Sequence, residues 1–109
     1  MRCLCVSCFD YYDTKMRHVI KFLKEQGHDV LYAVADFDHY TKEYRKDKRN
    51  DTEYLHVKKY AKNLSVARLA SHSGFAKKAY ALAKKYKPHM IYCMFPPNSL
   101  VKLKSVIIL

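Results

Sequence analysis

MRHVIKFLKEQGHDVLYAVADF, residues 16–37, predicts a helix followed by a buried strand. The helix has one apolar face, made by residues that recur every three or four positions: Met16, Val19, Ile20 and Leu23. Gly27 is expected to end it, because glycine adopts the left-handed conformation of a helix end without a Cβ penalty. Residues 30–35 are apolar at every position, which is typical of a parallel strand covered by helices on both faces. The stretch is therefore the second half of a βαβ unit.

The first half of that unit lies directly upstream. Arg2–Cys8 is apolar at almost every position and predicts the first strand, and Phe9–Lys15 is the loop at its carboxyl end. Thr14 or Asp13 is expected to cap a helix that begins near Met16. The loop contains no glycine, so the dinucleotide-binding fingerprint is absent and no nicotinamide or flavin cofactor is expected.

Downstream, the sequence predicts a continuing α/β pattern. Residues 53–57 alternate as an edge strand, after a charged and exposed excursion over 43–51. A long helix capped by Asn63 or Ser65 should run to about Tyr86, with the quartet 71–74 as a site of breakage or kinking. Two buried faces are predicted for this helix. One is made by Val66, Leu69, Ala70, Ser73, Ala76, Tyr80 and Ala83, and the other by Phe75, Ala79 and Leu82.

His89–Phe95 predicts a third buried parallel strand, followed by a short helix capped by Asn98 or Ser99 and ending near Lys104. The 109 residues suit one domain, with a Rossmann-like three-layer α/β/α fold and a mostly parallel sheet. The chain finishes on an apolar strand-like run, residues 105–109, which suggests a domain that is cut short.

Polar side chains follow the predicted strands where each one ends. In open α/β sheets this edge binds ligands, so these residues are candidates for contact with an acceptor or substrate. They are Asp10, Tyr11, Tyr12, Lys15, Arg17, Asp36, Asp38, His39, Lys42, Pro97, Asn98 and Ser99. For residues 36–42 a simple turn made by two aspartates and a helix cap is the favoured alternative. No catalytic residue is identified.

The four cysteines are predicted to be core residues and not metal ligands. Cys3, Cys5 and Cys93 lie within apolar strands, where free cysteine packs as a small hydrophobe. Zinc sites usually combine two Cys-x-x-Cys pairs, and only Cys5-x-x-Cys8 is present.

Charge is distributed unevenly along the chain. Residues 1–41 hold five basic and six acidic side chains, whereas residues 42–109 hold sixteen basic and four acidic ones. A net charge of +12 on the second part favours an anionic partner: phosphate, nucleic acid or anionic lipid. The basic loop Lys58–Lys62, with Tyr60 inside it, either grips phosphates or is a solvated connection. A solvated lysine-rich surface is the simpler alternative explanation of this positive charge.

Several stretches together resemble one family. They are Arg17, Gly27-His28-Asp29-Val30, Asp36-Phe37-Asp38-His39, residues 60–69, Ser71-His72, residues 87–92 and Pro96-Pro97-Asn98-Ser99-Leu100. Their order resembles the N-terminal domain of glycosyltransferase family 4, and in particular the enzymes of capsular and other surface polysaccharide synthesis. The resemblance covers nearly the whole chain.

The resemblance implies a two-domain GT-B enzyme that transfers a sugar from a nucleotide-sugar donor to a glycan or lipid-linked acceptor. In that family the N-terminal domain mainly receives the acceptor, and a C-terminal domain binds the donor. This chain corresponds to the first domain, lacks the tryptophan and the Gly-Gly turn of many relatives, and is expected to be inactive by itself.

Two other function classes remain open: a basic nucleic-acid-binding module and a flavodoxin-like interaction domain. No RNA-binding signature is present and the tyrosines are scattered, so no nucleic acid partner is expected. No apolar run is long enough for a transmembrane helix or a secretory leader. The expected location is the cytoplasm, peripheral on the inner membrane face.

Overall fold

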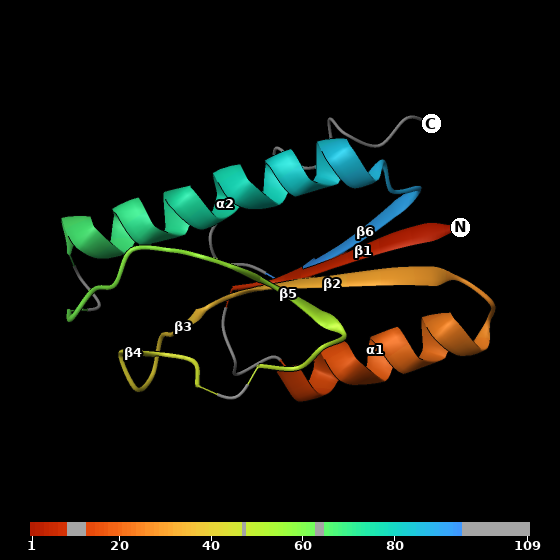
Figure 1. The fold of residues 1–109 in the computed structure, drawn as a ribbon, viewed down its shortest axis with the longest axis horizontal. Helices are drawn as coiled ribbons and strands as arrows, with labels where there is room; N and C mark the ends of the chain where they lie inside the picture. The colour runs from red at the N-terminus through yellow and green to blue at the C-terminus, as the bar shows by residue number, and fades with distance from the viewer. Residues whose placement is uncertain (9–12, 47, 63–64, 95–109) are drawn as a thin grey trace.

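The computed structural model describes residues 1–8, 13–46, 48–62 and 65–94. Four parallel strands form the main sheet in the order β5 (Thr52–Leu55), β2 (Asp29–Ala35), β1 (Arg2–Ser7) and β6 (Met90–Met94). Helix α1 (Asp13–Glu25) covers one face of this sheet and α2 (Val66–Tyr86) covers the other (Figure 1). The predicted three-layer α/β fold is confirmed. An edge strand was predicted for residues 53–57, and the strand at that edge is Thr52–Leu55, so His56 and Val57 follow it.

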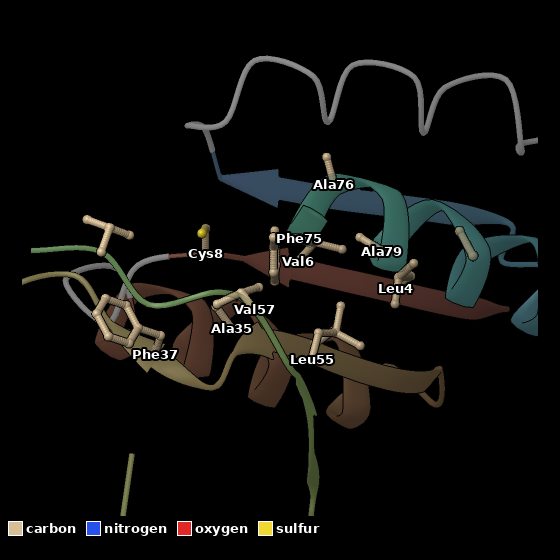
Figure 2. Close-up of a cluster of buried hydrophobic side chains, with 13 residues drawn as sticks. Leu4, Val6, Cys8, Ala35, Phe37, Leu55, Val57, Phe75, Ala76 and Ala79 are labelled. Atoms are coloured by element: carbon tan, nitrogen blue, oxygen red, sulfur yellow. The ribbon is translucent and has the colours of Figure 1, made fainter. Parts of the chain in front are cut away.

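Strand β1 divides its side chains between two cores, because successive residues of a strand point to opposite faces. Leu4, Val6 and Cys8 pack with Phe75 and Ala79 of α2, as Figure 2 shows. The core on the α1 side is smaller and contains Cys3, Cys5, Met16, Ile20, Leu23, Tyr32 and Val34. The cysteines of the first strand are buried as predicted, and Cys93 is half-buried. Cys5 and Cys8 belong to different faces of the sheet, so they do not form a metal-binding pair.

Helix α1 ends at Gly27 as predicted. Its φ of 85° places it in the left-handed region, and the His28 amide donates to the Leu23 carbonyl at 3.1 Å. This pattern closes a helix by satisfying its last carbonyls. The predicted start was wrong, because the helix begins at Asp13, so Asp13 and Thr14 form its first turn and do not cap a helix that starts near Met16.

Helix α2 begins and ends where the sequence predicts, but its buried face differs. The Ser65 hydroxyl accepts from the Arg68 amide at 3.1 Å, and Lys87 (φ 55°) closes the helix with a bond from its amide to the Ala83 carbonyl. The helix runs without interruption through residues 71–74. The face that contacts the sheet is made by Ser71, His72, Phe75, Ala76, Ala79 and Ala83.

The predicted apolar face of α2 was therefore wrong in its first half. Val66 and Leu69 are 82% and 69% exposed, and Ala70 and Ser73 are also exposed. Alanines occur all around this helix, so its apolar pattern has little direction. Packing against the sheet, and not periodicity, decides which side is buried.

Two further predictions need correction. Strand β6 pairs with β1, but its residues are half-buried or exposed, whereas the sequence predicted a buried strand. The segment after β2 folds into a second, two-stranded antiparallel sheet, β3 (Phe37–Asp38) and β4 (Glu43–Tyr44). The sequence predicted only a turn and a charged excursion here, because strands of two residues leave no periodic signal. Of the helices in the described part of the chain, none has the length and apolar character needed to cross a bilayer.

Candidate functional site at the carboxyl edge of the sheet

Polar side chains gather where β1, β2 and β5 end. Because these strands are parallel, Cys8, Asp36 and His56 follow three neighbouring strands at one edge of the sheet. The β3–β4 hairpin and the segment 56–62 continue from this edge, and the first half of α2 lies over it (Figure 1). The edge therefore brings together residues that are far apart in the sequence.

The centre of the site is a chain of three buried side chains, His39, Tyr60 and His72. The Tyr60 hydroxyl is hydrogen-bonded to Nδ1 of His39 and lies 3.4 Å from Nε2 of His72. All three side chains are less than 10% exposed. A phenol has one proton, so Tyr60 donates to one imidazole and accepts from the N–H of the other. The Tyr60 hydroxyl can therefore donate to His39 and accept from His72, or donate to His72 and accept from His39.

The three groups are uncharged at neutral pH. Burial, together with the Arg68 guanidinium and the neighbouring His39 imidazole, lowers the pKa of His72 to about 4. Burial, Lys42 and Arg68 also lower the pKa of His39, while Asp38 opposes this shift. Burial raises the pKa of Tyr60 to about 12. The site thus presents neutral imidazoles in an environment rich in cations.

Two cationic side chains are held by backbone carbonyls, Lys42 beside the His39–Tyr60–His72 cluster and Arg45 near Cys8. The Lys42 ammonium donates to the His39 carbonyl and lies 5.4 Å from the centre of the Tyr60 ring. Arg45 Nε donates to the Ala35 carbonyl at 2.6 Å, and burial lowers the pKa of this guanidinium. The Ala35 carbonyl is at the end of β2 and the His39 carbonyl is in the β3–β4 hairpin that continues from it, so both cations lie at the carboxyl edge of the sheet.

The two aspartates of the predicted rim have structural roles. Asp36 accepts from the Val57 amide at 3.1 Å and pairs with the His56 imidazole at 2.7 Å, which ties the end of β2 to the segment after β5. Asp38 accepts from the amides of Tyr40 and Thr41. The turn that the sequence favoured for these residues is therefore present at Asp38, and neither carboxylate is at the centre of the site.

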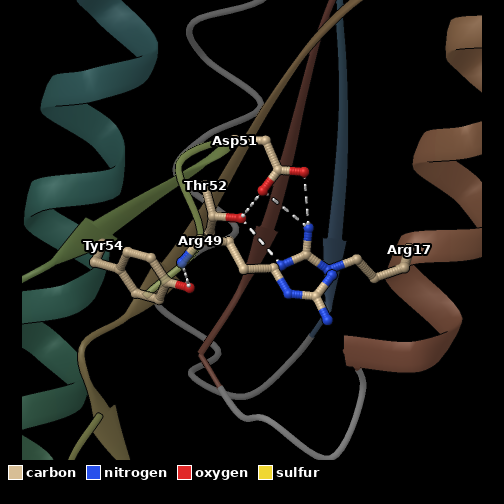
Figure 3. Close-up of polar contacts among 5 residues, drawn as sticks. All are labelled: Arg17, Arg49, Asp51, Thr52 and Tyr54. Atoms are coloured by element: carbon tan, nitrogen blue, oxygen red, sulfur yellow. Dashed lines mark hydrogen bonds and ion pairs between the residues drawn. The ribbon is translucent and has the colours of Figure 1, made fainter. Parts of the chain in front are cut away.

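Arg17 lies in a different place from His39 and Lys42. Its guanidinium is bonded to both carboxylate oxygens of Asp51 and, at 3.0 Å, to the hydroxyl of Thr52, as Figure 3 shows. It also lies 5.0 Å from the centre of the Tyr32 ring, in the core on the α1 side. An open groove of about 410 Å³ runs beside it, lined by Arg17, Ile20, Lys21, Lys24, Glu25, Arg49 and Asp51.

The remaining predicted residues divide into two groups. Lys15 is exposed on the first turns of α1. Asp10, Tyr11, Tyr12, Pro97, Asn98 and Ser99 lie outside the described residues. Of the candidates that the structure describes, it thus brings together His39 and Lys42, with Asp36 and Asp38 supporting the surrounding backbone.

Sequence reasoning missed Tyr60, His72, Arg45 and Arg68 as members of the site. The spacing of these residues carries no periodic signal, since they come from a loop, a helix and the residue after β4. His72 lies in the quartet that the sequence predicted to break or kink the helix, and its partner Tyr60 lies in the segment that the sequence predicted to be a basic loop. The only available signal was that both lie in segments that contributed to the family resemblance.

The three side chains of the His39–Tyr60–His72 cluster bond one another and, together with Cys8, Ala35, Phe37, Val57 and Ser71, line a cavity that has no room for a water molecule. A ligand therefore reaches them only if these side chains move apart. Their chemistry, neutral imidazoles and a phenol with cations nearby, is suited to hydroxyl groups and phosphate. Across the described ranges, no group of three or more His, Cys, Asp or Glu side chains comes together in a way that could hold a metal ion. No protein-family model, curated protein or solved structure matches the chain.

Proposed function

We propose that this chain is the acceptor-binding part of a glycosyltransferase, which moves a sugar from a nucleotide-sugar donor to a polysaccharide or lipid-linked acceptor. The observation that carries the proposal is the buried chain His39–Tyr60–His72 at the carboxyl edge of a parallel sheet. Ligands of open α/β sheets bind outside this edge. The family resemblance of the sequence supports the same assignment.

Burial of the three polar side chains His39, Tyr60 and His72 has a free-energy cost that packing of the core does not require. An apolar trio would fill the same space without desolvating two imidazoles and a phenol. Buried polar groups with shifted pKa values are common at binding and catalytic sites, because ligand chemistry needs them there. This reasoning supports a ligand-binding role for the cluster over a purely structural one.

In the proposed reaction, an acceptor hydroxyl oxygen forms a bond to the anomeric carbon of the donor sugar. The bond from that carbon to the nucleotide phosphate breaks, and the nucleoside diphosphate leaves with the bonding electrons. The hydroxyl proton passes to a base. In this proposal the buried cluster opens to admit the acceptor: the imidazoles then bond its hydroxyls, and Lys42 and Arg68 favour a phosphate if the acceptor is linked to a lipid diphosphate.

The donor would bind to a second domain, so the chain by itself is expected to bind acceptor without transferring sugar. The proposed location is the cytoplasm, with the protein peripheral on the inner membrane face, where a lipid-linked acceptor is presented. Turnover of a nucleotide sugar by this chain, in the absence of any other protein, would contradict this division of roles.

Acceptor binding can be tested by NMR with the histidine side chains labelled. The chain is titrated with a short-chain prenyl-diphosphate-linked sugar, and the ring signals of His39 and His72 are expected to shift. Tyr60→Phe removes the hydroxyl that joins the two rings. Loss of about one hydrogen bond should weaken binding about fivefold to tenfold.

The matched control is Tyr86→Phe, which removes a similar hydroxyl at the other end of the sheet. Tyr86 bonds the Asp29 carbonyl at 3.4 Å, at the start of β2. The Tyr86→Phe variant should bind the acceptor as tightly as the unmodified chain. Equal weakening in both variants, or histidine signals that do not respond to the acceptor, would overturn the proposal.

A further inference from the structure

The second part of the chain contains no acidic residue after Glu53. Between Tyr54 and Met94 the sequence has nine lysines and arginines and no Asp or Glu. This stretch includes the end of β5, all of α2 and β6. Soluble domains usually mix both signs of charge on their surface. The absence of acidic residues along all of α2 therefore favours a partner of opposite charge on this face.

Helix α2 forms the outer layer on its side of the sheet (Figure 1). Its outward strip is the set of residues that 3.6 residues per turn places opposite the sheet. The strip is exposed along its length and consists of Val66, Ala70, Ser73, Lys77, Ala81 and Lys84, with Leu69 beside it near the start. Its first half is apolar and its second half is basic.

Two features make the outward strip unusual. Val66 and Leu69 are more than two-thirds exposed although both are aliphatic, and they lie one turn apart. Lysines lie on either side of this apolar end: Lys58, Lys59 and Lys62 precede the helix, and Lys77, Lys84 and Lys85 follow along it. Lys78 is not counted with them, because its ammonium donates to the His56 carbonyl at 2.6 Å. The Ser65 hydroxyl bonds the Lys62 carbonyl at 2.8 Å, which holds the first group at the start of the helix.

We propose that the outward strip of α2 is a docking surface for an anionic lipid bilayer. Exposed aliphatic side chains next to lysines on one helix face are the features by which helices bind in the plane of a membrane interface. Val66 and Leu69 enter the headgroup region, and the lysines pair with anionic headgroups. The inference rests on the proposed peripheral location and names the surface that produces it.

Charge by itself would also suit a nucleic acid, but the apolar end of the strip does not. Proteins that bind single strands stack bases on aromatic side chains. The exposed apolar side chains here are aliphatic, and the ring of Tyr80 is only half-exposed, with the Lys84 ammonium 5.4 Å from its centre. The strip therefore fits lipid better than RNA.

The test is co-sedimentation with vesicles of neutral phosphatidylcholine or of phosphatidylcholine with about 30% phosphatidylglycerol. The chain should bind the anionic vesicles and bind the neutral ones weakly. Lys77→Gln/Lys84→Gln should weaken partitioning roughly 25-fold, since each lysine near such a surface contributes about fivefold. Leu69→Ser should weaken it about fivefold or more, because an aliphatic side chain no longer enters the interface.

The control is Lys21→Gln/Lys24→Gln, which makes the same charge change on exposed residues of α1, across the sheet. It should weaken partitioning less than threefold. An equal loss in both lysine pairs would show that net charge and not the strip is responsible. No effect of Leu69→Ser, or retention on single-stranded RNA but not on anionic vesicles, would also overturn the inference.

The vesicle assay tests the membrane inference and the acceptor titration tests the proposed function, so either one can be contradicted without the other. Tyr60→Phe should weaken acceptor binding about fivefold to tenfold and leave vesicle binding unchanged, because the Tyr60 hydroxyl is buried and away from the outward strip. Leu69→Ser should do the reverse when the acceptor has a short, soluble chain. A chain that binds the acceptor but not the vesicles contradicts the membrane inference only.

Discussion

Stability should fall as the pH falls from about 6.5 to about 4, because His72 is buried as a neutral base. Its pKa is about 4 in the folded chain, against 6.5 for the free side chain. Between these values the unfolded chain binds a proton that the folded chain does not. The free energy of unfolding is therefore undiminished above pH 6.5 and decreases as the solution becomes more acidic.

The size of this effect follows from the pKa difference. A shift from 6.5 to about 4 corresponds to about 3 kcal/mol, at 1.36 kcal/mol per unit. The unfolding free energy of a domain of this size is roughly 5–15 kcal/mol, so His72 is expected to remove a substantial part of it. The lowered pKa of His39 acts in the same direction.

Urea unfolding at a series of pH values between 7 and 4 measures this dependence. His72→Gln removes the titrating group while retaining a polar side chain, so its unfolding free energy should fall less steeply over this range than that of the unmodified chain. His18→Gln, at an exposed position on α1, should leave the steep dependence intact. If the His72→Gln curve runs parallel to the unmodified one, the assignment of a buried neutral imidazole is wrong.

Three further substitutions and one thiol reaction test the packing. Gly74→Ala should stabilise the chain by about 0.5–1 kcal/mol in chemical denaturation, because Gly74 lies within α2 and an added Cβ meets nothing within 4 Å. Gly27→Ala should destabilise it by about 1 kcal/mol, because the φ of 85° is unfavourable for alanine. Phe75→Ala should cost about 3–5 kcal/mol, since Phe75 is fully buried against β1. Burial raises the pKa of Cys8 to about 12, so its thiol should react with Ellman's reagent at pH 8 far more slowly than in urea.

Local patterns were sufficient to predict most of the framework. The apolar periodicity of α1, the glycine that ends it and the continuous apolar run of β2 each depend on near neighbours in the chain. Parallel pairing then follows from the βαβ order, because a strand joined through a crossover helix to the next strand usually lies parallel to it. Edge placement of β5 was predicted in the same way, from its short alternating pattern.

Tertiary structure decided which residues form the site. His39 could be proposed from the sequence because it follows a strand, but Tyr60 and His72 are 21 and 33 positions further along and come from a loop and a helix. Their contact depends on how α2 is rotated against the sheet, and an alanine-rich helix has no strong apolar stripe to set that rotation. The sequence by itself therefore determined the order and polarity of the elements, which depend on interactions between near neighbours. Packing of α2 determined both the buried polar chain and the apolar end left facing solvent, because one rotation of the helix places His72 inward and Leu69 outward.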